Sequence, residues 1–258
     1  MERGGTEMTN PTTVVPLPAP SAAPAAGVGL THRGRVRDRN EDAILTDPAG
    51  RLWVVADGMG GYGHGDIAAD IVIDCLETIA DDEDPGPALA GRIREANRRV
   101  IARAGQSGFS QMGATVVALI VDRRTAHLAW VGDSRAYLLR DRRLRQLTHD
   151  HSLVQSLVDQ GRLSPAAAET HPDSHIVTRA VGGGPEIDID RIAQPLVAGD
   201  RLLLCSDGLT RVVPDGPVET ILAATPDPFD AAQALIRAAL DNGAPDNVSV
   251  IVVDVGAG

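Results

Sequence analysis

The sequence predicts an α+β fold, in which helices pack on the outside of sheets. Short apolar runs recur along the chain, and several end at turn residues such as Asp and Gly. The runs between residues 114 and 139 are joined by about 2–5 residues, a spacing typical of an antiparallel meander. Helical patterns do not alternate one by one with these runs, so the order is not that of a parallel α/β sheet.

Six apolar runs are predicted to form strands. Most of their residues are β-branched or aliphatic, which favours a half-buried or buried extended chain. Polar turns separate neighbouring runs, for example at 122–125 and 140–143. The predicted strands cover residues 52–56, 114–121, 126–131, 136–139, 201–205 and 248–253.

Four further segments have the apolar spacing of an amphipathic helix. In the first segment, Ile67, Ile71 and Cys75 fall on one face. Two others begin with a proline, which suits the first turn of a helix. The predicted helices cover residues 65–80, 87–104, 152–160 and 228–241.

The chain divides into a leader and one domain. Residues 1–25 are rich in Pro, Ala and Thr and lack a core-forming pattern, so we expect a disordered leader. From Ala26 the apolar pattern tightens, and neither an internal repeat nor a second linker follows. Residues 26–258 are therefore predicted to form a single domain.

Composition excludes several classes of protein. The formal net charge of −11 argues against a protein that coats nucleic acid. No apolar stretch reaches the roughly 18–20 residues of a membrane span, and the first residues do not read as a secretory signal. The two cysteines make no disulfide framework, and we expect both to fill the core of a cytoplasmic protein.

Aspartates stand at the ends of several predicted strands. Asp57, Asp133 and Asp207 each follow an apolar run, and Asp246 precedes the last run. Antiparallel strands can bring such positions to one edge, where carboxylates repel one another unless a cation lies between them. Hard oxygen ligands favour Mg²⁺ or Mn²⁺, and no Cys or His cluster has the spacing of a zinc site. Taken alone, however, any one Asp-Gly pair is explained more simply as a turn than as part of a metal site.

A glycine-rich segment begins at Asp57 and leads to the helix predicted from Gly65. Such a segment lets a ligand approach the backbone closely, and a helix N-terminus favours anions. It is not a P-loop, because the Gly-Lys-Ser/Thr ending is missing and the chain contains no Lys.

Eight short motifs occur in an order that resembles the bacterial form of the metal-dependent protein phosphatases, the PPM class or type 2C. Each motif alone is weak, whereas the ordered set is specific, and the resemblance covers residues 27–255. The motifs are Arg37–Asp42, Asp57–Gly61, Gly113–Thr115, Val131–Tyr137, Leu147–Ser152, Thr178–Gly182, Ser206–Leu209 and Asp246–Asn247.

The resemblance implies an αββα sandwich of two antiparallel sheets, with a dinuclear Mn²⁺ or Mg²⁺ centre at one edge. It implies that Arg37 clamps the substrate phosphate, as the planar guanidinium of Arg binds two oxygens at once. The implied metal ligands are Asp57 (bridging both ions), the carbonyl of Gly58, Glu41 (directly or through water), Asp207 and Asp246, with Asp133 at a third, weaker site.

The sequence departs from the family where many bacterial members have a His after Asp-Gly-Met-Gly-Gly. Tyr62 occupies that position, and His64 lies two residues on. His64 is a candidate general acid for the leaving alkoxide, although a loop His is more often only solvated. Residues 148–176 match the flap segment of bacterial members. We expect its histidines to be surface residues and not ligands: His149, His151, His171 and His175.

Arginine stands at every second position from residue 33 to 39, up to and into the motif Arg37–Asp42, and in an extended strand these four side chains share one face. Only Arg37 matches the family motif. We expect the others, Arg33, Arg35 and Arg39, to be solvated.

The leading hypothesis is a serine/threonine protein phosphatase that hydrolyses phosphoproteins through a metal-activated water. Its expected partners are phosphorylated proteins and Ser/Thr kinases or their substrates, with no nucleic acid and no membrane, and the domain is expected to be a monomer. Two alternatives stay open: a catalytically weak PPM-like regulatory or scaffold domain, and a general phosphomonoesterase. The carboxylate set argues against a scaffold, because a scaffold has no need of groups that repel one another without metal.

Overall fold

The computed structural model describes residues 13–14, 25–60, 64–107 and 112–256. Of the predicted leader, it describes Thr13 and Val14, which pair with the first long strand, and Ala25, which is the buried first residue of that strand. The rest of the predicted leader lies outside the described residues.

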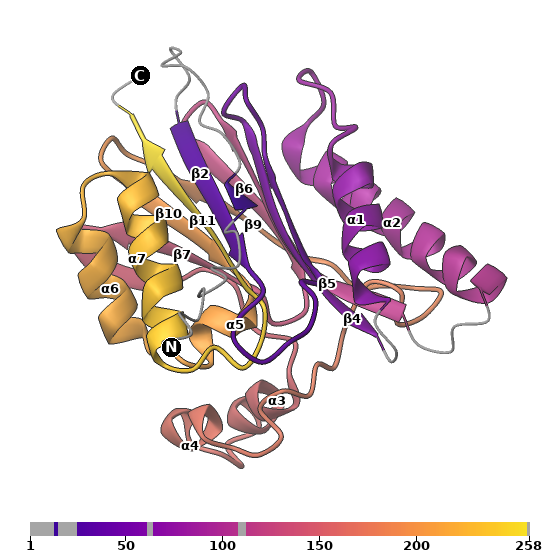
Figure 1. Cartoon of the computed structure of the whole chain (residues 1–258). Helices are drawn as coiled ribbons and strands as arrows, with labels where there is room; N and C mark the ends of the chain where they lie inside the picture. The colour runs from indigo at the N-terminus through magenta and orange to yellow at the C-terminus, as the bar shows by residue number, and fades with distance from the viewer. Residues whose placement is uncertain (1–12, 15–24, 61–63, 108–111, 257–258) are drawn as a thin grey trace, which may run out of the picture.

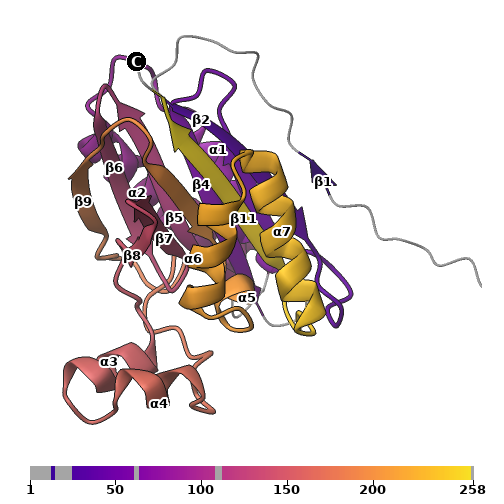
Figure 2. The ribbon, with the colours of Figure 1, turned by 90° about the vertical axis from the view of Figure 1, so that its left-hand side faces the viewer.

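The described strands form two antiparallel sheets (Figures 1 and 2). The six-stranded sheet has the order β1 (Thr13–Val14), β2 (Ala25–His32), β11 (Val248–Val255), β10 (Arg201–Cys205), β7 (Arg135–Arg140) and β8 (Arg143–Gln146). The five-stranded sheet has the order β3 (Asp42–Thr46), β4 (Leu52–Gly60), β5 (Met112–Asp122), β6 (Thr125–Val131) and β9 (Asp190–Pro195).

Helices cover the outer face of each sheet (Figure 1). Helices α1 (Gly65–Leu76) and α2 (Pro85–Ser107) pack on the five-stranded sheet. On the other side, α5 (Asp207–Thr210), α6 (Asp215–Ala224) and α7 (Pro228–Asp241) pack on the six-stranded sheet. The short helices α3 (Leu153–Asp159) and α4 (Pro165–Glu169) lie together at one end, apart from the four layers (Figure 2). The predicted αββα architecture is confirmed.

Strand β4 shows why the predicted strands are continuous apolar runs. Successive side chains of a strand point to opposite faces. Leu52, Val54 and Ala56 accordingly join the apolar layer under α1 and α2, whereas Trp53 and Val55 join the layer between the two sheets. Because both faces of this strand are buried, polar residues have no place between the apolar ones.

The predicted elements are present, with shifted ends and several additions. Strands β1, β2, β3, β8 and β9 and helices α4, α5 and α6 were not predicted from the sequence. In β2, Gly27 and Gly29 interrupt the apolar run, yet both are needed because large side chains fill their space. A Cβ at Gly27 would lie 2.3 Å from Nε1 of Trp53.

The prediction that the alternate arginines share a strand face is wrong. Residues 33–41 form a loop between β2 and β3, and side chains along it have different partners. Arg35 Nε donates to the carbonyl of Leu240 at 2.7 Å, and Arg37 reaches Asp246. Arg35 and Arg39 are exposed, as predicted.

Candidate metal centre

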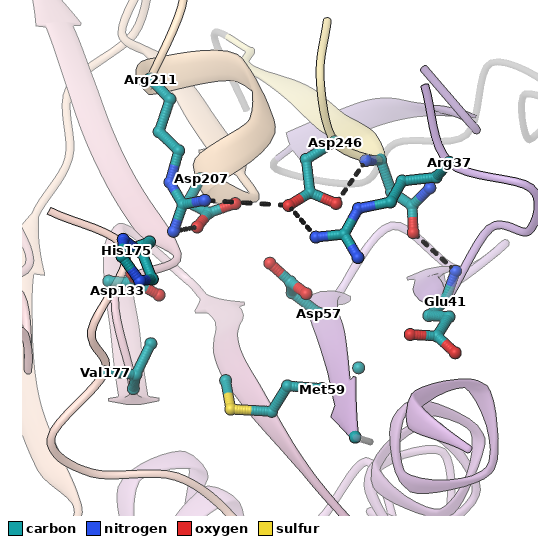
Figure 3. Close-up of a pocket in the computed structure, with 13 residues that line it drawn as sticks. Arg37, Glu41, Asp57, Met59, Asp133, His175, Val177, Asp207, Arg211 and Asp246 are labelled. Atoms are coloured by element: carbon teal, nitrogen blue, oxygen red, sulfur yellow. Dashed lines mark hydrogen bonds and ion pairs between the residues drawn. The ribbon is translucent and has the colours of Figure 1, made fainter. Parts of the chain in front are cut away.

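A cavity of about 330 Å³ opens at the edge where the two sheets meet. Figure 3 shows carboxylates entering it from several sides, with Arg37 and Arg211 at its borders. It is lined by Arg37, Glu41, Asp57, Gly58, Met59, Gly60, Asp133, His175, Val177, Asp207, Arg211, Asp246 and Asn247. All the residues predicted to hold metal, and the predicted phosphate clamp, are therefore in one cavity.

The two sheets each contribute part of this set. Asp57 lies within β4, paired with Asp42 of β3 and Thr115 of β5, so the prediction that it follows a strand is wrong. Asp207 begins α5 directly after β10, and Asp246 lies just before β11. Because β10 and β11 are antiparallel neighbours, the end of one and the start of the other lie at the same edge.

Asn247 fastens the loop that carries Arg37 and Glu41 to this edge. Its Nδ2 donates to the carbonyls of Arg33 and Arg39, both at 2.8 Å, and its Oδ1 accepts from the backbone N–H of Glu41 at 2.8 Å. One buried side chain thus satisfies three backbone groups of a loop that lacks strand partners. The positions of Arg37 and Glu41 follow from these bonds.

Glycines allow the backbone to pack closely around the centre. Gly58 donates its N–H to the carbonyl of Glu41 at 3.0 Å, and a Cβ on Gly58 would lie 2.1 Å from the carbonyl oxygen of Gly65. A Cβ on Gly208 would lie 1.8 Å from the carbonyl oxygen of Asn247. The close packing at Gly208 brings the start of α5 against the residue that fastens the loop.

Replacing Gly208 by Ala is expected to destabilise the protein by about 3 kcal/mol, because the added methyl group overlaps a backbone oxygen that cannot move independently. The measurement is the free energy of unfolding by denaturant. The matched control is Gly216→Ala in α6, where a Cβ meets nothing within 4 Å. That control is expected to be neutral or slightly stabilising, since Ala favours the helix. Equal losses for the two variants would contradict the packing argument.

The carboxylates of the cavity are costly to ionise together. Burial, followed by repulsion from Asp42 and Asp207, raises the pKa of Asp57 well above its usual range. Burial and the neighbouring Asp207 raise the pKa of Asp133 to about 8. The pKa of Asp207 is also raised, chiefly by burial and against the favourable charge of Arg211. A positive charge at the centre would relieve this repulsion.

Asp42 belongs to the same cluster and was not assigned a role from the sequence. The residue is half-buried with Oδ1 of its carboxylate buried, and desolvation raises its pKa to about 7 although it accepts hydrogen bonds from the hydroxyls of Ser206 and Ser249. The sequence did offer one signal, since Asp42 directly follows Glu41 in the motif Arg37–Asp42. The sequence does not reveal the register of β3 with β4, which places Asp42 opposite Asp57.

Three carboxylate oxygens of the cluster are buried without a hydrogen-bond partner: Oδ1 of Asp42, Asp133 and Asp207. A buried acceptor left unpaired is unfavourable, so these oxygens favour a bound cation. Oxygen donors of this kind suit Mg²⁺ or Mn²⁺. On these grounds the residues present fit divalent ions.

Arginines, however, occupy part of the cluster. Arg37 Nη2 lies 2.8 Å from Oδ2 of Asp246, and Arg211 pairs with Asp207 and lies 3.7 Å from Asp246. Among the residues described, no three His, Cys, Asp or Glu side chains already stand in an arrangement that could hold a metal ion. The carboxylates therefore have to turn from these guanidinium groups to share an ion.

Residues 28–242 match the sequence model of the family described as Protein phosphatase 2C. The chain belongs to this family. Together with the αββα sandwich, the match confirms the resemblance inferred from the ordered motifs.

Bacterial type 2C phosphatases are similar to most of this chain. The serine/threonine protein phosphatase PstP of Mycobacterium tuberculosis is 42% identical over 231 residues, covering 87% of this chain and 44% of PstP. The serine/threonine phosphatase stp of Listeria welshimeri is 37% identical over 235 residues, covering 87% of this chain and 93% of that protein. The chain thus spans less than half the length of the first relative and nearly all of the second.

A solved type 2C structure has the same fold and holds metal. The crystal structure of the catalytic domain of PstP in complex with two manganese ions superposes with a TM-score of 0.83 at 37% identity. The superposition covers 90% of this chain and 98% of that chain. In that relative, two manganese ions accompany the fold described above.

The histidines of the type 2C flap, residues 148–176, do not all behave as predicted. His151 is buried, so its assignment to the surface is wrong. Its Nδ1 accepts from the N–H of Gly132 at 3.0 Å, and its ring stacks on Trp130. His149 pairs with Asp159 at 2.8 Å and is exposed. His175 lines the cavity.

His64 directly precedes α1 and is not among the residues that line the cavity. Its role as general acid stays a prediction. Tyr62, which stands where many relatives have a His, lies outside the described residues.

Proposed function

We propose that this protein is a metal-dependent serine/threonine protein phosphatase. The observation that carries the proposal is a cluster of buried carboxylates with unpaired oxygens beside an exposed arginine, in the cavity of a type 2C fold. The side chain of Arg37 is 54% exposed, while its partner Asp246 is 21% exposed. A cationic group is thus available at the mouth, and acceptors for cations lie behind it.

Each residue of the cavity has a proposed role. Asp57, the carbonyl of Gly58, Asp207 and Asp246 would hold two divalent ions, with Glu41 on the Gly58 side and Asp133 at a third site. Divalent ions bound there would neutralise the carboxylates and supply an activated water for attack on phosphorus. Manganese is favoured by the relative that contains it, and magnesium accepts the same kind of oxygen donors.

Arg37 would bind and orient the phosphate. Its guanidinium can donate two parallel hydrogen bonds to phosphate oxygens, which fixes the direction of the phosphoryl group as well as attracting it. Cys75 and Cys205 are buried, and burial raises the pKa of both thiols, so neither is suited to act as nucleophile. No covalent intermediate on the protein is required.

Further features of the proposal concern the cell. We propose that phosphoserine and phosphothreonine proteins are the substrates, including kinases or kinase targets, and that the domain acts as a cytoplasmic monomer without nucleic acid. As a separate observation, none of the helices within the described ranges combines the length and the apolar composition of a membrane span.

The test compares a phosphothreonine peptide with a sugar phosphate in the presence of Mn²⁺. We expect kcat/KM for the peptide to exceed that for the sugar phosphate by about a hundredfold or more, because extended substrates make additional contacts that a small ester lacks. Arg37→Ala is expected to lower kcat/KM for the peptide about 10–100-fold through loss of charge-assisted hydrogen bonds. Its matched control is Arg39→Ala, an exposed arginine outside the cavity lining.

The alternatives give different results in the same experiment. A general phosphomonoesterase would hydrolyse both substrates at similar rates. A scaffold domain would hydrolyse neither and would show no Mn²⁺ binding in titration calorimetry. Either pattern would refute the proposed function.

A further inference from the structure

A second cavity, of about 520 Å³, continues from the metal centre beneath the flap. We name it the flap groove. It shares Asp133, Asp207 and Arg211 with the first cavity. Its other lining residues are Arg135, Gln146, Asp150, Ser152, Val154, Gln155, Val158, Pro165, Ala168, Thr170, Ser174, Thr210, Val212, Pro214 and Asp215. The shared residues make the groove an extension of the candidate active site.

Polar groups on the floor of the flap groove are already paired with one another. Arg135 binds both carboxylate oxygens of Asp150, with distances of 2.7–3.0 Å, and Gln146 donates to the same carboxylate at 2.8 Å. Tyr137 donates to Asp215 at 3.0 Å. Asp133 and Asp207, where the groove meets the metal centre, keep unpaired oxygens. Farther from the metal centre, a small ion would have to break the bonds just described, so that part of the groove is poorly suited to charged ligands.

Apolar side chains stand on both walls. Val154 and Val158 come from α3 on the flap side, and Ala168 comes from α4. Val212 and Pro214 follow α5 on the opposite side. Val158, Ala168 and Val212 are only half-buried, so a ligand that covers them gains hydrophobic contact.

The base of the flap is tied to the sheets, which gives the groove a defined shape. His151 donates its N–H to the carbonyl of Gly132 at 2.9 Å and accepts from the N–H of Thr178 at 2.8 Å. Leu153 donates its N–H to the carbonyl of Ile176, also at 2.9 Å. Both ends of the flap are thus held beside Asp133, and Figure 2 shows α3 and α4 projecting from that end of the molecule.

From these observations we infer that the flap groove binds a bulky aliphatic side chain of the substrate polypeptide, close in sequence to the phosphorylated residue. The inference rests on the proposed function, because it extends the same active site. An extended chain advances about 3.3–3.6 Å per residue, so a residue within three positions of the phosphoresidue can reach an adjoining cavity. The continuity of the two cavities and the apolar walls favour this occupant.

A leucine scan of a phosphothreonine peptide tests the inference. In an otherwise Ala-based peptide, Leu is placed singly at each of the three positions on either side of phosphothreonine, and kcat/KM is measured with Mn²⁺. We expect at least one Leu position to raise kcat/KM about tenfold over the Ala peptide, because a buried aliphatic side chain adds binding energy. Val158→Asp is expected to remove this preference.

Two variants and one small substrate serve as controls. Val197→Asp makes the same change at a 50% exposed valine outside the groove, and the leucine preference is expected to survive. Hydrolysis of p-nitrophenyl phosphate, which has no flanking residues, should stay within about twofold of wild type for Val158→Asp. Ala168→Trp fills the groove by bulk and should also abolish the preference, and circular dichroism checks that each variant is folded.

Each outcome decides a separate question. If the wild-type protein hydrolyses all peptides at equal rates, or if Val158→Asp and Ala168→Trp keep the leucine preference while folded, the inference is wrong and the proposed function stands. If the wild-type protein hydrolyses p-nitrophenyl phosphate but no phosphopeptide, the proposed function itself is wrong. Sedimentation that shows a dimer dissociated by Val158→Asp would assign the groove to a second copy of the chain.

Discussion

Replacing Asp57 by Asn is expected to abolish Mn²⁺-dependent phosphopeptide hydrolysis while stabilising the metal-free protein. The side chain is central to the carboxylate cluster, and Asn offers a weaker, uncharged ligand. We expect kcat to fall on the order of a thousandfold. Without metal, the buried carboxyl is unfavourable, since burial and neighbouring aspartates raise its pKa. The thermal midpoint in chelator should therefore rise for the variant.

The expected loss of activity and the expected gain in metal-free stability have opposite signs, so the loss of activity could not be attributed to unfolding. Thermal unfolding in chelator at pH 8 and again in excess Mn²⁺ gives the stabilisation by metal, which is expected to be large for wild type and small for Asp57→Asn. The matched control is Asp241→Asn, an exposed carboxylate at the end of α7, for which neither quantity should change. Activity within tenfold of wild type would show that Asp57 is not an essential metal ligand. A lower midpoint in chelator would show that its carboxylate does not destabilise the metal-free protein.

The second large effect is a fall in the stability of the metal-free protein as the pH rises from 6.5 to 8. The folded state raises the pKa of Asp42 to about 7 and that of Asp133 to about 8. An unfolded chain loses these protons near pH 4, so the folded state holds more protons throughout this window. Stability is then lost with increasing pH, by about 2–3 kcal/mol or roughly 5–10 °C in thermal midpoint.

The window begins at pH 6.5 because a buried histidine acts in the opposite direction below it. Burial lowers the pKa of His151, so its folded form gains stability as the pH rises toward the usual histidine pKa. Calorimetry in chelator measures the slope, and Asp133→Asn should flatten it. Saturating Mn²⁺ should reverse the trend, since metal binding favours the ionised carboxylates. A flat profile in chelator would contradict the raised pKa values.

The parts of the fold that could be predicted from sequence are those with both faces buried. Strands such as β5 and β10 contain uninterrupted apolar runs, Val116–Val121 and Leu202–Cys205, and the composition of these runs alone indicates a strand. Strand β9 alternates half-buried and exposed residues, and β2 contains two glycines. Their identity depends on neighbours far away in sequence, such as Trp53 against Gly27, and is not encoded locally.

The residues of the candidate site likewise fall into those that the sequence indicates and those that only the structure reveals. Asp57, Asp207 and Asp246 could be proposed because they stand at apolar runs, and the cavity brings them together. Asp42 and Arg211 were missed, since their contribution arises from the register of β3 with β4 and from the short helix after β10. His151 was misplaced because its burial depends on Trp130 and Gly132, which no local pattern links to the flap.

The side chain of Asp42 has a consequence for the whole sandwich. It belongs to β3 of one sheet and accepts hydrogen bonds from Ser206, which follows β10 of the other sheet, and from Ser249 of β11, at 2.9 and 2.7 Å. Asp57 lies in the first sheet, whereas Asp207 and Asp246 lie next to the ends of β10 and β11 of the second sheet. The thickness of the apolar layer between the sheets therefore sets the separation of the two groups of ligands. The distance between the two sheets is therefore constrained twice, by the packing of the core and by the spacing that the bound ions require.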